Sequence, residues 1–263
     1  MGRAVVVLKS RIIPVLLLKA GRMVKGRQFK DFRDTGDAVS AAKVYNHQDA
    51  DELVFIDIEA SRPGYKKNRA ELYRVVEKVA EVCFMPLCVG GGVDSVEDAV
   101  QLIKIGADKV IINTAAVENP TLIQRVADTL GAQSVVVAVD VKKEEERYVI
   151  YTHCATQPRL DVVLEKYILG LELRGAGEVF INSIDCDGMM KGYDLSLLKL
   201  VRANTSMPVI ACGGAGDFKH LVEAFQQTRV NAVACASLFH FGDNNPLRAK
   251  AYLKNYGISL KKI

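Results

Sequence analysis

Two glycine-rich segments have the residue types that bind phosphate groups. Three consecutive glycines follow Val89, and a Gly-Gly-Ala-Gly run follows Cys212. A short apolar strand that ends in glycines lets the backbone approach an anion because no Cβ atom is in the way, and the amides ahead of the next helix donate hydrogen bonds. Two such segments predict a ligand with a phosphate at each end. The candidate phosphate-binding residues are Gly91, Gly92, Asn113 and Thr114 in the first half of the chain and Gly213, Gly214, Ala236 and Ser237 in the second.

The glycine segments belong to a longer internal repeat. Residues 52–58 (ELVFIDI) correspond to residues 178–185 (EVFINSID), and their offset of about 126 residues is close to the offset between the two glycine runs. Self-similarity at a fixed spacing indicates a structure built from repeated units. The chain therefore reads as one half-molecule that has been doubled.

Short apolar runs alternate with amphipathic stretches along the whole chain, which is the pattern of β/α units around a parallel sheet. Eight such runs in 263 residues predict an α/β protein: a single (β/α)8 TIM barrel over 1–263, built as two similar half-barrels. Functional residues of such barrels lie at the carboxyl ends of the strands. The predicted strands cover 12–18, 53–58, 87–89, 109–112, 134–139, 178–183, 209–211 and 232–235, and two of the predicted helices cover 68–83 and 160–174.

Two longer segments interrupt this alternation. Segment 20–36 is rich in glycine, lysine and arginine, which predicts a mobile lid over bound phosphate. Segment 141–157 contains a strand-like stretch at 148–153, which predicts a hairpin beside the site.

The composition argues against several classes of function. A net charge of +4 without a basic stripe argues against nucleic acid as a partner and suits an anionic small molecule. The six cysteines include no Cys-x-x-Cys pair, so we expect no metal site, and no cofactor is predicted. The apolar run at 5–8 is too short for a signal peptide and no later run reaches membrane-spanning length, which predicts a cytoplasmic protein without membrane contact.

Many segments of the chain, in one order, carry the pattern of a single known family. They are residues 11–14, 21–26, 51–57, 89–93, 106–110, 112–120, 135–140, 174–178, 184–185, 187–188, 213–216 and 239–241. On these residues the chain resembles the HisF family, the cyclase subunits of imidazole glycerol phosphate synthase, over nearly its whole length after about residue 10. Members of this family are barrels that receive ammonia from a partner glutaminase at the N-terminal face. They use it on a doubly phosphorylated ribonucleotide at the opposite face.

The resemblance implies an ammonia entrance and a partner. Arg11, Glu52, Lys109 and Glu178 match the ring of alternating charge that gates ammonia in this family, and Asp108 matches a position that faces the glutaminase. A HisH-like glutaminase is therefore the expected partner, in a heterodimer. The same four charges have a second interpretation, a stabilising ion-pair cluster at the end of the barrel.

The family's pair of catalytic carboxylates is only half present. Asp140 matches the carboxylate at the end of the fifth strand, but Leu17 stands where the first strand should end in an aspartate, and a second acidic position nearby is Ala20. Leucine cannot transfer a proton, and the loss of one acid/base group costs about 10²- to 10⁴-fold in rate. The resemblance also assigns substrate binding to Lys25, Asp57 and Asp187.

Three functions stay open at this point. The leading hypothesis is an ammonia conduit with weakened or lost cyclase chemistry, which docks a glutaminase and serves a sugar amidotransferase. This is the role of HisF-like paralogues in lipopolysaccharide biosynthesis, and Leu17 together with the four retained gate charges favours it. The alternative is an active lyase of histidine biosynthesis, in which Asp140 alone, or a neighbour such as Asp185, suffices. A third hypothesis is a non-catalytic regulatory subunit whose phosphate sites sense a metabolite.

Overall fold

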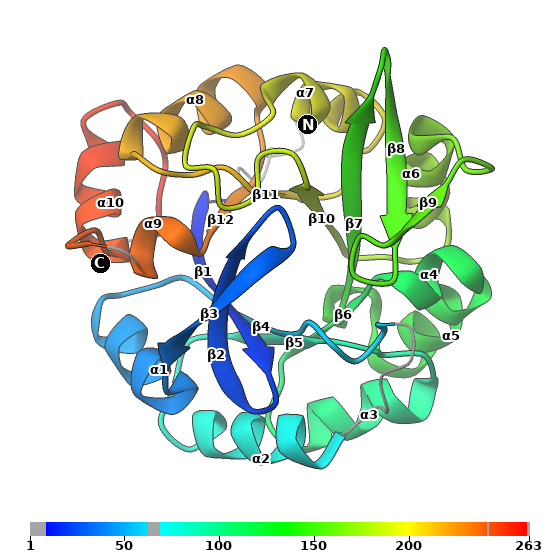
Figure 1. Cartoon of the computed structure of the whole chain (residues 1–263), viewed down its shortest axis with the longest axis horizontal. Coiled ribbons are helices and arrows are strands. Elements are labelled where there is room, and N and C mark those ends of the chain that lie inside the picture. The colour runs from blue at the N-terminus through cyan, green and yellow to red at the C-terminus, as the bar shows by residue number, and fades with distance from the viewer. Residues whose placement is uncertain (1–8, 63–68, 241, 262–263) are drawn as a thin grey trace, which may run out of the picture.

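Eight parallel strands close into a barrel in the computed structural model, which describes residues 9–62, 69–240 and 242–261. Each strand pairs with its neighbours in parallel, and β12 pairs with β1 to close the ring (Figure 1). In order around the ring the strands are β1 (Arg11–Lys19), β4 (Leu53–Asp57), β5 (Leu87–Gly90), β6 (Lys109–Ile112), β7 (Val135–Glu144), β10 (Glu178–Ser183), β11 (Val209–Cys212) and β12 (Ala232–Cys235). The predicted (β/α)8 barrel is confirmed.

Helices surround the barrel as an outer ring (Figure 1). Their apolar residues recur every three or four positions, so one face of each helix packs against the strands. On α2 (Arg69–Ala80) this face consists of Leu72, Val75, Val76 and Val79. The other helices are α1 (Ala38–His47), α3 (Val96–Lys104), α4 (Thr114–Glu118), α5 (Thr121–Leu130), α6 (Leu164–Leu173), α7 (Leu195–Ala203), α8 (Phe218–Thr228), α9 (Ser237–His240) and α10 (Pro246–Lys254), and a 3-10 turn covers Ala132–Ser134.

The two helices predicted by range differ from the structure at their ends. The helix predicted at 68–83 is α2. Residue 68 lies outside the described residues, as do the apolar run at 5–8 and residue 241. The helix predicted at 160–174 begins only at Leu164. The preceding residues form β9 (Gln157–Arg159) and a turn in which the Val162 amide donates to the Arg159 carbonyl.

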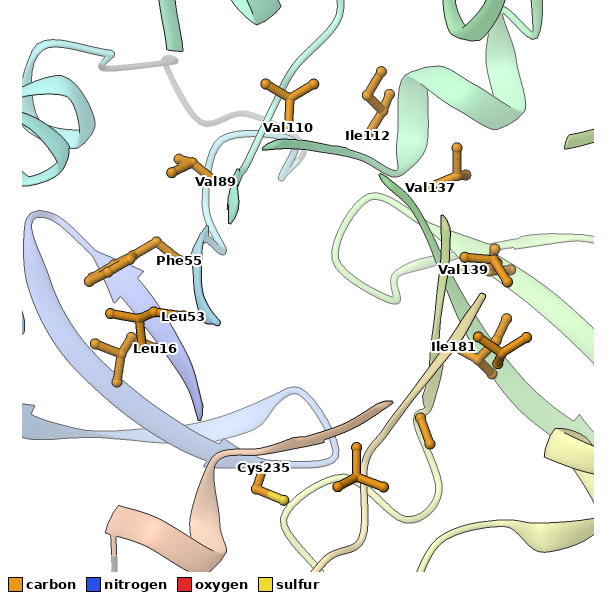
Figure 2. Packing of buried hydrophobic residues seen from close by; sticks show 14 of the residues in the cluster. Leu16, Leu53, Phe55, Val89, Val110, Ile112, Val137, Val139, Ile181 and Cys235 are labelled. Atoms are coloured by element: carbon orange, nitrogen blue, oxygen red, sulfur yellow. The ribbon is translucent and has the colours of Figure 1, made fainter. Parts of the chain in front are cut away.

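Alternate residues of the barrel strands form two apolar layers. Outward-facing side chains such as Leu16, Phe55 and Val137 point towards the helices (Figure 2). Inward-facing side chains fill the barrel, and on β1 these are Ile13 and Val15. Because successive side chains of a strand point to opposite faces, Leu17 also faces the interior. The interior cluster comprises Ile13, Val15, Val54, Cys88, Ile111, Val136, Ala138, Phe180, Ile210, Ala232 and Ala234, with Leu17, Ile56, Cys212 and Ala236 packed against it.

Both interruptions of the barrel form antiparallel hairpins. Segment 20–36 contains β2 (Arg22–Arg27) and β3 (Lys30–Gly36), which continue from β1 and lie across the ring of strands in Figure 1. The Gln28 amide donates to the Asp187 carbonyl, so this hairpin contacts the loop after β10. Its mobility stays a prediction. The second hairpin is confirmed, because β7 continues beyond the barrel and pairs with β8 (Arg147–Thr152).

Candidate active site

A pocket opens at the carboxyl ends of the barrel strands. It extends from Ile111 and Phe180 inside the barrel to Phe29 and Phe32 on the β2–β3 hairpin. Most residues that the sequence nominated for this face line it together, namely Leu17, Lys25, Asp57, Gly91, Gly92, Asn113, Thr114, Asp140, Asp187 and Ala236. Gly213, Gly214 and Ser237 are not among the lining residues.

The first glycine segment forms an open cradle at this pocket. A Cβ atom on Gly91 would lie 2.6 Å from the Asp57 carbonyl oxygen, and one on Gly92 would lie 2.8 Å from the Cβ of Ala60. Both glycines also have positive φ angles, 115° and 62°, so only glycine fits without strain. The Thr114 hydroxyl oxygen accepts a hydrogen bond from the backbone amide of residue 153 at 3.0 Å, which leaves its O–H able to donate to a ligand.

The second glycine segment is covered by a neighbouring loop. Gly213 and Gly214 are buried, and a Cβ atom on Gly214 would lie 2.0 Å from the Gly192 carbonyl oxygen. The Gly192 amide donates to the Gly214 carbonyl at 2.8 Å, which holds the 186–192 loop against the segment. Ser237 is buried as well, so only Ala236 of this predicted cradle reaches the pocket surface.

Asp140 is a buried carboxyl group suited to proton transfer. It faces the interior of β7, where its two oxygens accept from the side-chain amides of Asn113 at 2.9 Å and Asn182 at 3.3 Å. Burial raises the pKa of Asp140 to about 7 and the charge of Asp187 adds to the rise, although both amide hydrogen bonds oppose it. A carboxyl group with this pKa can give or take a proton near neutral pH.

Leu17 occupies the opposite, apolar side of the same pocket. Its pairing partner on the adjacent strand β4 is Ile56, which also lines the pocket and packs against the interior cluster. The remaining acidic lining residues are Asp57, Asp94, Glu118 and Asp187. Among them, the charge of Asp187 contributes to the raised pKa of Asp140.

The other nominated polar residues have different environments. Lys25 is 3% exposed and binds both carboxylate oxygens of Asp187, at 2.9 and 3.1 Å. Asp57 accepts the Glu59 amide, and burial raises its pKa. Asp185 is not among the lining residues of the pocket, and its carboxylate accepts the Lys143 amide close to the turn of the β7–β8 hairpin. This placement favours Asp140 over Asp185 as the acid at the pocket.

The four predicted gate residues form a closed ring at the other end of the barrel. Arg11 binds Glu52 at 2.6 Å and Glu178 at 3.0 Å, and Lys109 binds the same two carboxylates at 2.9 and 3.2 Å. Burial alone would lower the pKa of Lys109, but the two glutamates outweigh it and raise that pKa. The second oxygen of Glu52 is buried without a hydrogen-bond partner among the described residues. Glu52 and Glu178 begin the matched repeat segments, so the ring has the twofold pattern expected of two half-barrels.

Sequence reasoning missed several polar residues of the pocket, and among them Asn182 contacts Asp140. Asn182 lies inside the strand predicted at 178–183. It could have been found from the sequence, because it is a polar amide at a strand position whose side chain points into the barrel. Within 9–62, 69–240 and 242–261, no cluster of three or more His, Cys, Asp or Glu side chains is arranged to hold a metal ion. No helix of the same residues is long and apolar enough to cross a membrane.

The barrel and its pocket define the class: a TIM-barrel protein with a small-molecule site at the carboxyl ends of its strands. A family model described as histidine biosynthesis protein matches residues 11–245. The imidazole glycerol phosphate synthase subunit HisF of Chlorobium phaeovibrioides is 45% identical over 254 residues, which cover 97% of this chain and 99% of the relative. The HisF subunit of Bacillus pumilus is 43% identical, with 96% and 99% covered. The chain belongs to the HisF family of histidine biosynthesis proteins.

This result confirms the predicted HisF family, but not the narrower prediction that the chain is a HisF-like paralogue serving sugar amidation. The matched relatives carry the name of imidazole glycerol phosphate synthase, which favours the histidine-biosynthesis alternative over the leading conduit hypothesis. The names of these relatives do not mention sugar amidation or lipopolysaccharide biosynthesis.

Proposed function

We propose that this chain is the lyase subunit of an imidazole glycerol phosphate synthase. It docks a HisH-type glutaminase at the charged ring, and ammonia crosses the barrel to a doubly phosphorylated ribonucleotide at the pocket. The observation that carries the proposal is Asp140, a buried acid with a pKa of about 7 held between two amides in a pocket that also contains a glycine cradle.

Opening the substrate and closing the imidazole ring both move protons, and Asp140 is positioned to exchange one of them. We assign the second proton transfer to Asp187, because Leu17 has no titratable group and Asp187 is the other lining carboxylate that interacts with Asp140. Lys25 orients Asp187 by donating hydrogen bonds to both of its carboxylate oxygens until substrate phosphate competes for the ammonium group. The first phosphate is held by Gly91, Gly92, Asn113 and Thr114, and Gly213, Gly214, Ala236 and Ser237 receive the second once the 186–192 loop moves.

The test supplies the nucleotide substrate with an ammonium salt in place of glutaminase and measures imidazole glycerol phosphate. Formation of this product, abolished by Asp140→Asn, is the expected result. Absence of product under these conditions, with the substrate still bound in calorimetry, would overturn the lyase assignment.

Leu17 favours a second candidate, ammonia delivery without cyclisation. In that case the chain activates its glutaminase and releases ammonia at the pocket, but forms no imidazole product from either nitrogen source. The two functions are separated by measuring glutamine hydrolysis and imidazole formation in the same reaction.

A further inference from the structure

One aromatic side chain lies inside the barrel between the charged ring and the pocket. It is Phe180, which is 2% exposed and is the single aromatic member of the interior cluster among the described residues. On β10, Phe180 follows Glu178 of the ring by two positions and precedes Asn182 of the pocket by two, so all three side chains point inward. With a rise of about 3.3 Å per residue, Phe180 lies about 7 Å along the strand from each of them.

Two aliphatic side chains lie at the same level as Phe180. Val54 on β4 lies two residues after Glu52, and its side chain therefore points inward directly above the ring, on the side of the pocket. Ile111 has the same relation to Lys109 on β6. Both Ile111 and Phe180 also line the pocket. The floor of the pocket is thus formed by side chains that lie directly above the charged ring.

A buried oxygen atom without a hydrogen-bond partner lies on each side of this level. On the ring side it is Oε1 of Glu52, and on the pocket side it is Oδ1 of Asn182; neither atom has a partner among the described residues. An unpaired buried acceptor costs about 1–3 kcal/mol, so both positions suit a small molecule that donates hydrogen bonds. Ammonia is such a donor, and the two oxygens mark a path that crosses the level of Phe180.

Phe180 is the residue at this level whose side chain can move aside. Val54 and Ile111 are β-branched and therefore stiff about χ1, whereas a phenylalanine ring can turn about χ1 and χ2. The pairing partner of Phe180 on β7 is Ala138, whose small side chain takes little of the space beside the ring. An apolar level of this kind admits neutral ammonia but not ammonium, because a charge would lose its hydration there.

We propose that the ring of Phe180 closes the barrel interior and turns aside to let neutral ammonia pass from Glu52 Oε1 to Asn182 Oδ1. This inference rests on the proposed function. It assigns Phe180 a gating role in which its ring controls delivery without touching the nucleotide chemistry. The closed ring also keeps water of the pocket away from the charged ring, so nitrogen crosses only in the form that can attack the substrate.

The experiment measures imidazole formation by the complex with the HisH-type glutaminase, first with glutamine and then with ammonium salt. Ammonia from glutamine must cross the level of Phe180, whereas ammonium salt reaches the pocket from its open side. Phe180→Trp is expected to lower the glutamine-to-ammonium rate ratio about tenfold or more, because a larger ring in a close-packed interior cannot turn. Phe180→Leu is expected to raise the ratio about twofold or more, because its smaller side chain leaves the path open.

The matched controls are Phe55→Trp and Phe55→Leu. Phe55 is as deeply buried as Phe180 and also belongs to a barrel strand, but its side chain points outward to the helices (Figure 2). These variants change the volume of the core without changing the barrel interior, so they are expected to leave the ratio unchanged. The ammonium-dependent rate of each variant verifies that the barrel and its pocket are folded.

An equal ratio in the wild type, Phe180→Leu and Phe180→Trp would overturn the inference. If Phe180→Trp does not fold, Phe180→Leu decides alone, and a ratio equal to or below that of the wild type overturns the gating role. A wild-type complex that forms no imidazole product from ammonium salt would instead refute the proposed function, and the gating role with it. A ratio that falls in the order Leu, Phe, Trp at position 180, with constant ratios at position 55, is the expected result.

Discussion

At the scale of single residues, a buried acid, Asp140, and an aliphatic side chain, Leu17, lie on opposite sides of the pocket. Asp140 is 8% exposed and its charged form is stabilised only by two side-chain amides. Burying a carboxyl group that ionises lowers the free energy of unfolding. A catalytic role would explain why the protein tolerates this loss of stability at Asp140. Leu17 faces it from β1 without such a cost, because it packs on the interior cluster.

Asp140→Asn should stabilise the protein while abolishing lyase activity. The raised pKa means that the folded state keeps a proton between pH 4 and 7 that the unfolded state releases, so stability falls as pH rises through this window. Asparagine removes that dependence, and its advantage should grow from nearly zero at pH 4 to at most about 4 kcal/mol above pH 7. Urea unfolding at pH 4, 6 and 8 measures it. A variant that is less stable than wild type at pH 8 would refute the assigned burial cost.

Leu17→Asp should not raise the rate of imidazole formation above that of Leu17→Asn, because the proposed mechanism assigns the second proton transfer to Asp187 and needs no acid at position 17. Leu17→Asn is the matched control, since it has similar size and polarity but cannot exchange a proton at neutral pH. Single-turnover kinetics with ammonium salt check the chemical step. A rate for Leu17→Asp about 10²- to 10⁴-fold above that of Leu17→Asn would mean that Asp187 does not provide the second proton transfer.

At the scale of elements, the eight strands were predictable because each is a short apolar run bounded by glycine or polar residues, and the predicted ends agree to within a few positions. β7 is the exception, because it was predicted to end at 139 and continues to Glu144. Its last residues are polar and become strand only by pairing with β8. Segment 20–36 shows the same limitation: no apolar alternation marks β3, whose order comes from backbone pairing with β2.

Lys25→Met should loosen the β2–β3 hairpin, since Lys25 is the buried cation that joins β2 to Asp187 after β10. Breaking a buried pair by removing one partner leaves an uncompensated carboxylate, so hydrogen exchange across 22–36 should accelerate and substrate affinity should fall about tenfold or more. Arg22→Ala is the control on the same hairpin, because its ion pair with Asp34 is exposed. Unchanged exchange in Lys25→Met would show that backbone pairing alone holds the hairpin.

At the scale of the whole molecule, two groups of candidate functional residues lie at opposite ends of the barrel. Proton-transfer and cradle residues lie at the carboxyl ends of the strands, and the charged ring lies at their amino ends, with an apolar interior between. The repeat predicted this twofold architecture and the cradle residues, whereas the charged ring and Asp140 were predicted from the family resemblance. It could not predict that the loop after β10 covers Gly213 and Gly214, because that contact depends on the path of a segment without periodicity.

Lys109→Met separates the two interpretations of the ring. If the four charges only stabilise the barrel, the variant loses stability, but the ratio of the rates of imidazole formation with glutamine and with ammonium salt stays the same. If the ring also controls ammonia entry, the ratio of the two rates changes, because the two glutamates lose one of the two cations that hold them across the ring. We expect a lower glutamine-to-ammonium ratio, together with a loss of about 1–3 kcal/mol in stability, since the pairs are partly exposed. The exposed Lys104→Met on α3 controls for the loss of a lysine, and an unchanged ratio in Lys109→Met would assign the ring to stability alone.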